Sequence, residues 1–161
     1  MTVGKNRIIG SVKSGKSTAL KYILDLPVIS GCQAEKEIEE MQRNVRQKVI
    51  GWLENRAESL IGSGEITEKQ KRMYSEPPVY RLCCEVSFPD DEYIQLIYTY
   101  SFQGDSGEYD ILISGKTGRA AGIGDFCKTG DRIRYSGCRF ILRRNHIIVF
   151  KKGKMHKIKR I

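Results

Sequence analysis

Residues 79–102 read VYRLCCEVSFPDDEYIQLIYTYSF, and the alternation within this stretch decides the fold class. Apolar side chains occupy every second position of each half, first Tyr80, Leu82, Cys84, Val86 and Phe88, then Ile94, Leu96, Tyr98, Tyr100 and Phe102. A period of two is typical of a half-buried β-strand. The acidic residues 90–92 separate the halves, so the stretch predicts two strands joined by a turn.

The preceding residues, 33–61, predict a long amphipathic helix. Apolar side chains recur there at intervals of three and four: Ile38, Met41, Val45, Val49, Trp52, Leu53, Leu60 and Ile61. This spacing places them on one helical face, and Gly62 and Gly64 are suitable residues to end the helix. We expect the apolar stripe to pack on the domain, on a partner or on a second copy of the chain. Residues 67–74 could add a second short helix.

Three further strands are predicted after residue 102, over 109–114, 131–140 and 146–151. A glycine-rich stretch separates the first two of them, and its residues Gly115 to Gly118 could form an anion-binding nest. The chain is therefore predicted to be α+β, with an N-terminal β or mixed segment at 1–31, a helical segment at 32–76 and a five-stranded unit at 77–161.

The segment TGDRIRYSG at 129–137 places a Gly-Asp turn before a strand that contains Gly137. With five strands and an intervening short helix, this pattern resembles the OB-fold superfamily, including single-strand-binding, replication-protein-A-like and telomere-end-binding modules. The resemblance implies a closed OB-like β-barrel with a nucleic-acid groove across its second and third strands. The acidic turn at 90–92 would lie beside that groove and is atypical of it.

Positive charge is concentrated in the last 34 residues, which contain twelve Lys or Arg and one acid, Asp131, although the whole chain has a net charge of +9. Such asymmetry favours a polyanion-binding surface, and we expect single-stranded DNA or RNA as the partner, in a replication, repair or telomere-type assembly. The cations predicted to contact phosphates are Arg132, Arg134, Arg139, Arg143, Arg144, Lys151, Lys152 and Lys154. Tyr98, Tyr100 and Tyr109 are candidates to stack on bases or, equally, to be core residues.

Residues 10–17, GSVKSGKS, match the phosphate-loop pattern G-x-x-x-x-G-K-[ST], with Gly15, Lys16 and Ser17 as the candidate nucleotide-binding residues. A P-loop domain needs parallel strands joined by helices, which the rest of the chain does not predict. Residues 6–29 also fit a β-hairpin that turns at Ser14 and Gly15. A P-loop nucleotide-binding protein is therefore the weakest of the functional alternatives.

No catalytic activity, cofactor or metal site is predicted. Cys127, Cys138, His146 and His156 are zinc-ligand types, but their spacing is unlike that of paired zinc ligands. Five cysteines without a disulfide-like pattern, no apolar run long enough for a membrane span and no secretory signal predict an intracellular protein, nuclear or cytoplasmic. The main alternative to nucleic-acid binding is a protein-interaction or oligomerisation module that uses the helix at 33–61.

Overall fold

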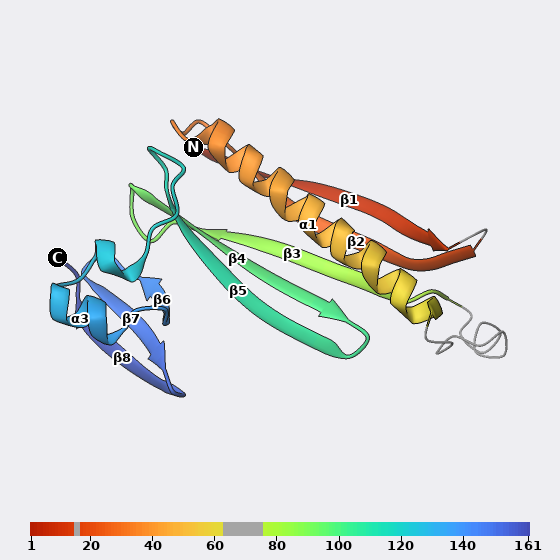
Figure 1. Ribbon diagram of the computed structural model, residues 1–161. Coiled ribbons are helices and arrows are strands. Elements are labelled where there is room, and N and C mark those ends of the chain that lie inside the picture. The colour runs from red at the N-terminus through yellow and green to blue at the C-terminus, as the bar shows by residue number, and fades with distance from the viewer. Residues whose placement is uncertain (15–16, 63–75) are drawn as a thin grey trace.

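The computed structural model describes residues 1–14, 17–62 and 76–161, which form two β-sheets and the helical elements that pack on them (Figure 1). The larger sheet has the order β1-β2-β3-β4-β5. Its strands are β1 (Thr2–Ser14), β2 (Ser17–Ser30), β3 (Val79–Ser87), β4 (Tyr93–Phe102) and β5 (Asp105–Ser114). The smaller sheet contains β6 (Arg139–Leu142), β7 (His146–Lys151) and β8 (Lys154–Lys159). The predicted α+β class is confirmed.

Strands β1 and β2 form the predicted N-terminal hairpin. They pair antiparallel from Thr2 opposite Ser30 to Ser14 opposite Ser17. Gly15 and Lys16 lie outside the described residues. A P-loop connects a strand to a helix whose N-terminus faces the phosphates, whereas the element that begins at Ser17 is a strand. The phosphate-loop alternative is therefore wrong for this fold.

Helix α1 (Glu35–Gly62) confirms the long helix predicted at 33–61, and it covers one face of the larger sheet (Figure 1). Ile38, Leu53 and Ala57 are buried against the sheet, and Val45 and Val49 pack on the same core. Most of the described part of the apolar stripe is thus used within the molecule. The short helix predicted at 67–74 lies outside the described residues.

The α1 segment makes the connection between β2 and β3 a crossover, so these two strands pair in parallel while the other pairs of the larger sheet are antiparallel. The strands β3, β4 and β5 form a meander, as the alternation at 79–102 predicts. Leu82, Cys84, Leu96 and Tyr98 are buried on the side that faces α1.

The predicted closed barrel is wrong. The larger sheet is mixed and open, with β1 and β5 as its two edges. The five strands assigned to one barrel divide between two sheets, because β6 pairs with β7, and β7 with β8, rather than with β3, β4 or β5. Barrel closure requires the last strand to pair back to the first part of the sheet, and the described strands have no such pairing.

The strand predicted at 131–140 is instead a short helix, a turn and only then a strand. Residues Thr129–Arg134 form the short helix α3, and β6 begins only at Arg139. In a strand, Ile133 and Tyr135 would share a face. Here Tyr135 is buried whereas Ile133 is 76% exposed. Gly137 has a φ of +71°, so it provides the left-handed backbone of the turn into β6 and is not a mid-strand residue.

A second core lies between the smaller sheet and the helical segments, which are the 3-10 turn η1 (Ile123–Asp125) and α3. It contains Phe126, Tyr135, Leu142, Ile147 and Val149, together with Leu112 of β5. Tyr93, which begins β4, packs edge-on against Phe126 at a centroid distance of 4.9 Å. The described helices include none that is long and apolar enough to cross a membrane.

Candidate polyanion-binding surface

Residues 128–161, here called the basic C-terminal unit, contain α3 and the β6–β8 sheet. Arg139 and Arg160 are the members of its twelve cations that form ion pairs within the described part of the chain. The other cations have no acidic partner there, so the unit retains most of its positive charge at its surface. An excess of unneutralised cations on a folded element creates a positive potential that attracts polyanions.

Four cations predicted from the sequence come together where α3 meets the β7–β8 turn. This group, the tip cluster, consists of Arg134, Lys151, Lys152 and Lys154. Lys151 and Lys154 are direct cross-strand partners at the end of the hairpin. The Nζ of Lys151 also donates a hydrogen bond to the backbone carbonyl of Arg134, which holds the end of α3 against β7. Like charges opposite each other destabilise a hairpin, so an anion between them would be favourable.

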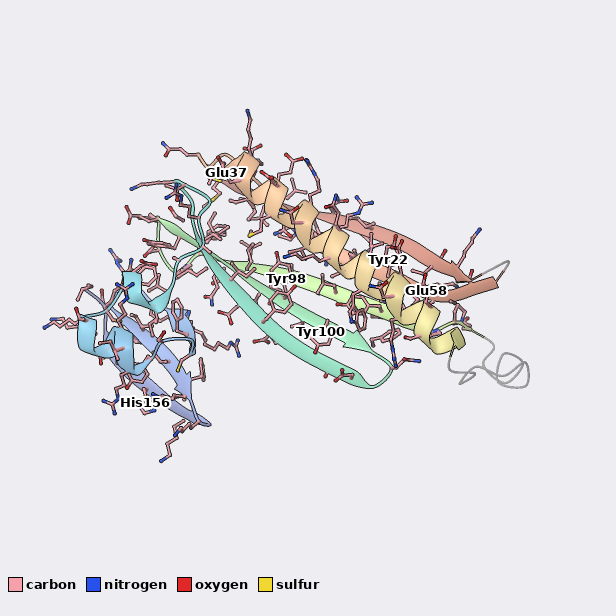
Figure 2. The ribbon with its side chains drawn as sticks, viewed as in Figure 1. Tyr22, Glu37, Glu58, Tyr98, Tyr100 and His156 are labelled. Atoms are coloured by element: carbon pink, nitrogen blue, oxygen red, sulfur yellow. The ribbon has the colours of Figure 1, made fainter. Side chains whose placement is uncertain are left out.

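The ring of Tyr135 contacts two cations of the tip cluster. The Arg134 guanidinium lies 5.4 Å and the Lys151 ammonium 5.5 Å from the centroid of its ring. The centroid of the His156 ring, which is labelled in Figure 2, lies 5.5 Å from the centroid of the Tyr135 ring. Both cations therefore have a fixed cation–π support, which leaves their remaining N–H groups available for an anion.

The turn itself directs the two remaining lysines outward. Lys152 and Gly153 have φ values of +49° and +73°, so both residues adopt left-handed backbone at the tip. This conformation is costly for a residue with a side chain, such as lysine. Lys152 and Lys154, on either side of Gly153, are both exposed.

Three of the other predicted cations lie elsewhere. Arg143 and Arg144 belong to the β6–β7 turn at the opposite end of the smaller sheet, and Arg132 lies against Gly124 of η1. Arg144 lines an open cleft of about 570 Å³ together with Lys159, Arg160 and the acidic residues Asp90, Asp91 and Glu92. The mixed charge of this cleft makes it a poor site for a polyanion. The eight predicted cations do not form one continuous track.

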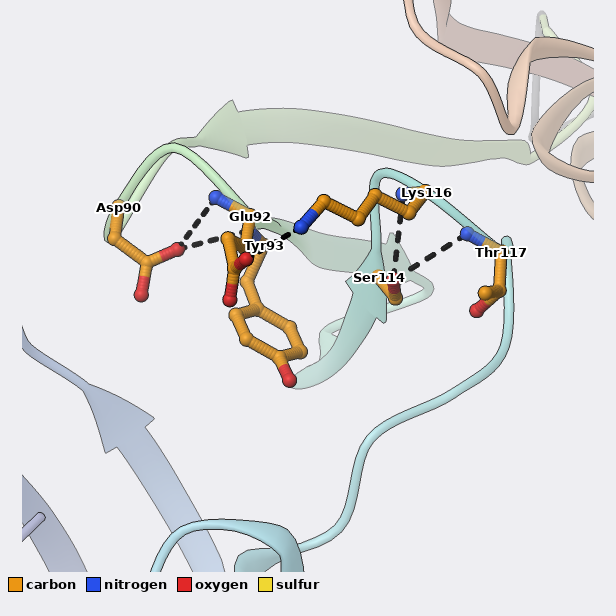
Figure 3. Close-up of polar contacts among 6 residues, drawn as sticks. All are labelled: Asp90, Glu92, Tyr93, Ser114, Lys116 and Thr117. Carbon is orange, nitrogen blue, oxygen red and sulfur yellow. Dashed lines mark hydrogen bonds and ion pairs between the residues drawn. The ribbon is translucent and has the colours of Figure 1, made fainter. Parts of the chain in front are cut away.

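The acidic loop at 90–92 has a structural role (Figure 3). The carboxylate of Asp90 accepts hydrogen bonds from the backbone N–H groups of Glu92 at 2.8 Å and Tyr93 at 2.9 Å, and from the guanidinium of Arg160. Burial opposes ionisation of Asp90, but these hydrogen bonds outweigh it and hold the pKa of its carboxyl below the usual value. The loop thereby fastens the C-terminus of the chain to the larger sheet.

The glycine-rich segment 115–118 does not present free backbone donors in the way an anion nest requires. The N–H groups of Lys116 and Thr117 both point to Oγ of Ser114, each at 3.3 Å (Figure 3). The Lys116 ammonium pairs with Glu92 at 2.6 Å. The nest interpretation is therefore wrong.

Arg139, also predicted to contact phosphates, forms ion pairs within the chain. Its guanidinium donates hydrogen bonds to Asp110 at 2.7 Å and to Glu108, both on β5. These carboxylates raise the pKa of Arg139, the hydrogen bond to Asp110 being the main cause. The sequence contained no signal for this contact, because Glu108 and Arg139 are far apart in the chain.

The predicted base-stacking tyrosines belong to the larger sheet and not to the basic C-terminal unit (Figure 2). Tyr98 is fully buried, and burial is the main cause that raises the pKa of its hydroxyl. Tyr109 stacks on Tyr98 with 4.8 Å between the ring centroids, and its side chain is 39% exposed. Tyr100 is half-buried and stacks on Tyr80. The core alternative holds for Tyr98, and the three rings form no stacking platform beside the cations.

The cysteine and histidine residues considered for zinc are separated by their elements. Cys127 is buried with its thiol directed at the carbonyl of Ile123, while His156 packs on Tyr135. Across residues 1–14, 17–62 and 76–161, no three His, Cys, Asp or Glu side chains are grouped as metal ligands would be.

Comparison with solved structures shows what this fold is similar to. A member of the DUF3298 family from Bacteroides fragilis aligns with a TM-score of 0.52 and 11% identity, over 98% of this chain and 89% of that chain. A DUF3298 family protein from Pseudomonas aeruginosa aligns over the same shares with a TM-score of 0.52 and 9% identity. No known protein family and no curated protein matches the sequence. At this identity the likeness concerns the fold alone, and it corrects the predicted OB-fold resemblance.

Proposed function

We propose that the protein binds a phosphodiester polyanion, with single-stranded nucleic acid as the first candidate, through the tip cluster of Arg134, Lys151, Lys152 and Lys154. The observation that carries the proposal is the convergence of these four cations on one hairpin end without an acidic partner among the described residues. Clustered cations repel one another, and bound phosphates relieve that repulsion while releasing counterions.

The mode of binding differs from that of an OB-fold groove. The cations lie at a convex hairpin tip, and the exposed tyrosine face is on the other sheet. Binding of this kind recognises the phosphate backbone rather than the bases, so we expect strong salt dependence and little sequence preference. A phosphodiester polymer without bases would satisfy the same contacts.

The test is a fluorescence-anisotropy titration of labelled oligo-dT at about 50 and 200 mM salt, with poly(glycerol phosphate) as a base-free competitor. The variant Lys152→Asn/Lys154→Gln removes two cations from the tip, and asparagine tolerates the left-handed backbone at position 152. Log affinity falls linearly with the log of the salt concentration, and each lost phosphate contact should make this slope less steep by about 0.7 for a single strand.

The matched control is Arg143→Gln/Arg144→Gln, which removes the same charge from the opposite end of the smaller sheet. The proposal requires a larger loss from the tip variant than from this control. Equal losses would indicate nonspecific attraction by net charge, and absence of oligonucleotide binding at low salt would refute the proposal. Competition by poly(glycerol phosphate) would indicate that bases are dispensable.

A protein-interaction role is the second candidate, and a different observation favours it. Strand β1 is a free edge of the larger sheet and is 13 residues long. Val3 and Ile9 on it are 47% and 70% exposed. A long edge with exposed apolar residues can accept another strand by β-augmentation. The helix α1 is less suitable than the sequence suggested, because Val45 and Val49 face the core.

A further inference from the structure

A groove between the N-terminal half of α1 and the β1–β2 hairpin has features of a ligand site. Its volume is about 260 Å³, and its apolar lining comes from Ile8 of β1, Leu26 and Val28 of β2 and Ile38 of α1. Drug-sized ligands occupy pockets of about 300–1,000 Å³, so this groove suits a smaller group, of the size of one apolar side chain.

One polar side chain within the groove is left incomplete. Gln42 of α1 is only 7% exposed and lines the groove. Its Oε1 accepts a hydrogen bond from the hydroxyl of Tyr98 at 3.0 Å, whereas its Nε2 has no partner in the described part of the chain. An unpaired buried amide group costs about 1–3 kcal/mol, so a hydrogen-bond acceptor that reached Nε2 from the groove would be stabilised there.

In the structure Tyr98 pairs with the oxygen end of this amide. The hydroxyl of Tyr98 can satisfy one end of the Gln42 side chain but not both, so one polar end of the amide always remains unpaired. With Oε1 held by Tyr98, the free end is a donor. A donor beside an apolar lining favours a ligand that carries an oxygen acceptor on an apolar group.

The charges around Gln42 favour an anionic acceptor. Arg46 lies one helical turn after Gln42 on the same face, lines the groove and has no ion pair within the described residues. The acidic residues of the same groove are engaged, since Glu35 accepts the N–H of Gly31 at 3.0 Å and Glu39 pairs with Arg43 at 3.3 Å. The uncommitted groups are thus an amide donor and a guanidinium.

We infer that this groove binds a carboxylate attached to a small apolar group, with the carboxylate between Gln42 Nε2 and Arg46 and the apolar group on Ile8, Leu26 and Ile38. Two sources share this chemistry, a free carboxylic acid and the C-terminus of a peptide that ends in an apolar residue. The site is separate from the tip cluster, which lies on the smaller sheet.

The experiment is an NMR titration of the full chain with 4-methylpentanoate and with its neutral isostere 4-methylpentanamide. A second pair, acetyl-Gly-Gly-Leu and its C-terminal amide, tests the peptide source. Both acids should bind saturably, with amide shifts in α1 and β1, and each neutral amide should bind at least about tenfold more weakly. Binding of only one acid identifies the source and still supports the site.

Two variants locate the carboxylate. Arg46→Gln should weaken acid binding about tenfold, because it removes a charge-assisted hydrogen bond. Gln42→Glu keeps an acceptor for Tyr98 but replaces the free donor with an anionic oxygen, so acid binding should be lost. The control Lys48→Gln removes an exposed charge of α1 that does not line the groove and should bind normally.

Three outcomes would overturn the inference. They are no saturable binding of either acid, equal affinity for an acid and its amide, and unchanged acid affinity in Arg46→Gln. If Gln42→Glu does not fold, the comparison of acids with amides and the Arg46→Gln variant decide alone. Oligonucleotide affinity should not change in Arg46→Gln, so the site can fail or stand independently of polyanion binding.

Discussion

Nε of Arg139 on β6 lies 2.7 Å from Oδ1 of Asp110 on β5, and this hydrogen bond joins the two sheets. The other oxygen of the Asp110 carboxylate accepts from Nε2 of Gln95 at 2.9 Å, and Gln95 is 3% exposed. Arg139 therefore completes a part-buried polar network where the smaller sheet meets the outer face of the larger one. This contact neutralises one cation of the basic C-terminal unit.

The network predicts that Asp110 and Arg139 contribute to the stability of the protein rather than to polyanion binding. Asp110→Asn should destabilise the protein by about 1–2 kcal/mol, because it weakens a charge-assisted hydrogen bond at a largely buried carboxylate. Urea denaturation measures this change. The control Lys116→Gln removes an exposed pair and should cost less than Asp110→Asn. A loss of oligonucleotide affinity in Arg139→Gln as large as that of the tip variant would contradict the structural role.

The carboxylates of Asp25 and Asp90 predict that the protein becomes less stable at acidic pH. Asp25 and Asp90 have pKa values below their usual value, Asp25 because Arg7 donates hydrogen bonds to it and Asp90 because hydrogen bonds from Arg160, Glu92 and Tyr93 outweigh its burial. A depressed folded-state pKa means that the unfolded chain binds protons more readily. Their contribution to the free energy of unfolding is therefore complete above a pH of about 3.9, the pKa of aspartate in the unfolded chain. It is lost as the pH falls through the lower pKa values of the folded state.

The measurement is the free energy of unfolding at about pH 6 and pH 3 in the wild type and in Asp90→Asn. The variant should be less stable near neutral pH and should lose less stability on acidification. An identical pH dependence in both proteins would show that Asp90 does not contribute.

Two glycines on the edge strands are predicted to be intolerant of side chains. Gly10 on β1 lies opposite Tyr22, and Gly107 on β5 lies opposite Tyr100. A Cβ at these positions would come within 2.2 Å and 2.6 Å of the respective tyrosine rings. Gly10→Ala and Gly107→Ala should therefore each destabilise by about 1 kcal/mol, since the rings must leave their positions.

Gly51 is the matched control for these substitutions. It lies in the middle of α1, and a Cβ added there would have no atom within 4 Å, so Gly51→Ala should stabilise by about 1 kcal/mol. Thermal unfolding compares the three variants. If all three shift the melting temperature in the same direction, the ring contacts are not responsible.

The exposure of Trp52 predicts the position of its fluorescence emission. The helical spacing predicts that Trp52 is buried in the apolar stripe, but its side chain is 51% exposed. The centroid of its ring lies 5.9 Å from that of Tyr80 and 6.1 Å from that of Phe102. Its emission should lie between those of buried and free indole. Trp52→Ala should cost about 2 kcal/mol, whereas Leu53→Ala, at a fully buried position, should cost about 2–5 kcal/mol. A larger loss from Trp52→Ala than from Leu53→Ala would contradict this placement.

Sequence patterns succeeded where neighbouring residues decide the structure. The period of two at 79–102 and the helical spacing at 33–61 are local properties, and β3, β4 and α1 form where they predict. The hairpin alternative for residues 6–29 is confirmed for the same reason. The short segment at 129–137 predicts a strand because Ile133 and Tyr135 alternate, but the six residues that form α3 fit either period.

Only the tertiary structure decided how the strands group and which charges remain free. Local turns join β6 to β7 and β7 to β8, but whether this three-stranded sheet also pairs with the meander depends on contacts between distant residues that no local period encodes. Likewise, the sequence by itself determined the excess of cations after residue 127, but the register of the two sheets decided that Arg139 meets Glu108 and Asp110 while Lys151 and Lys154 face each other. Composition sets the total charge of a segment, whereas neutralisation depends on distances of a few ångströms between side chains that folding alone brings together.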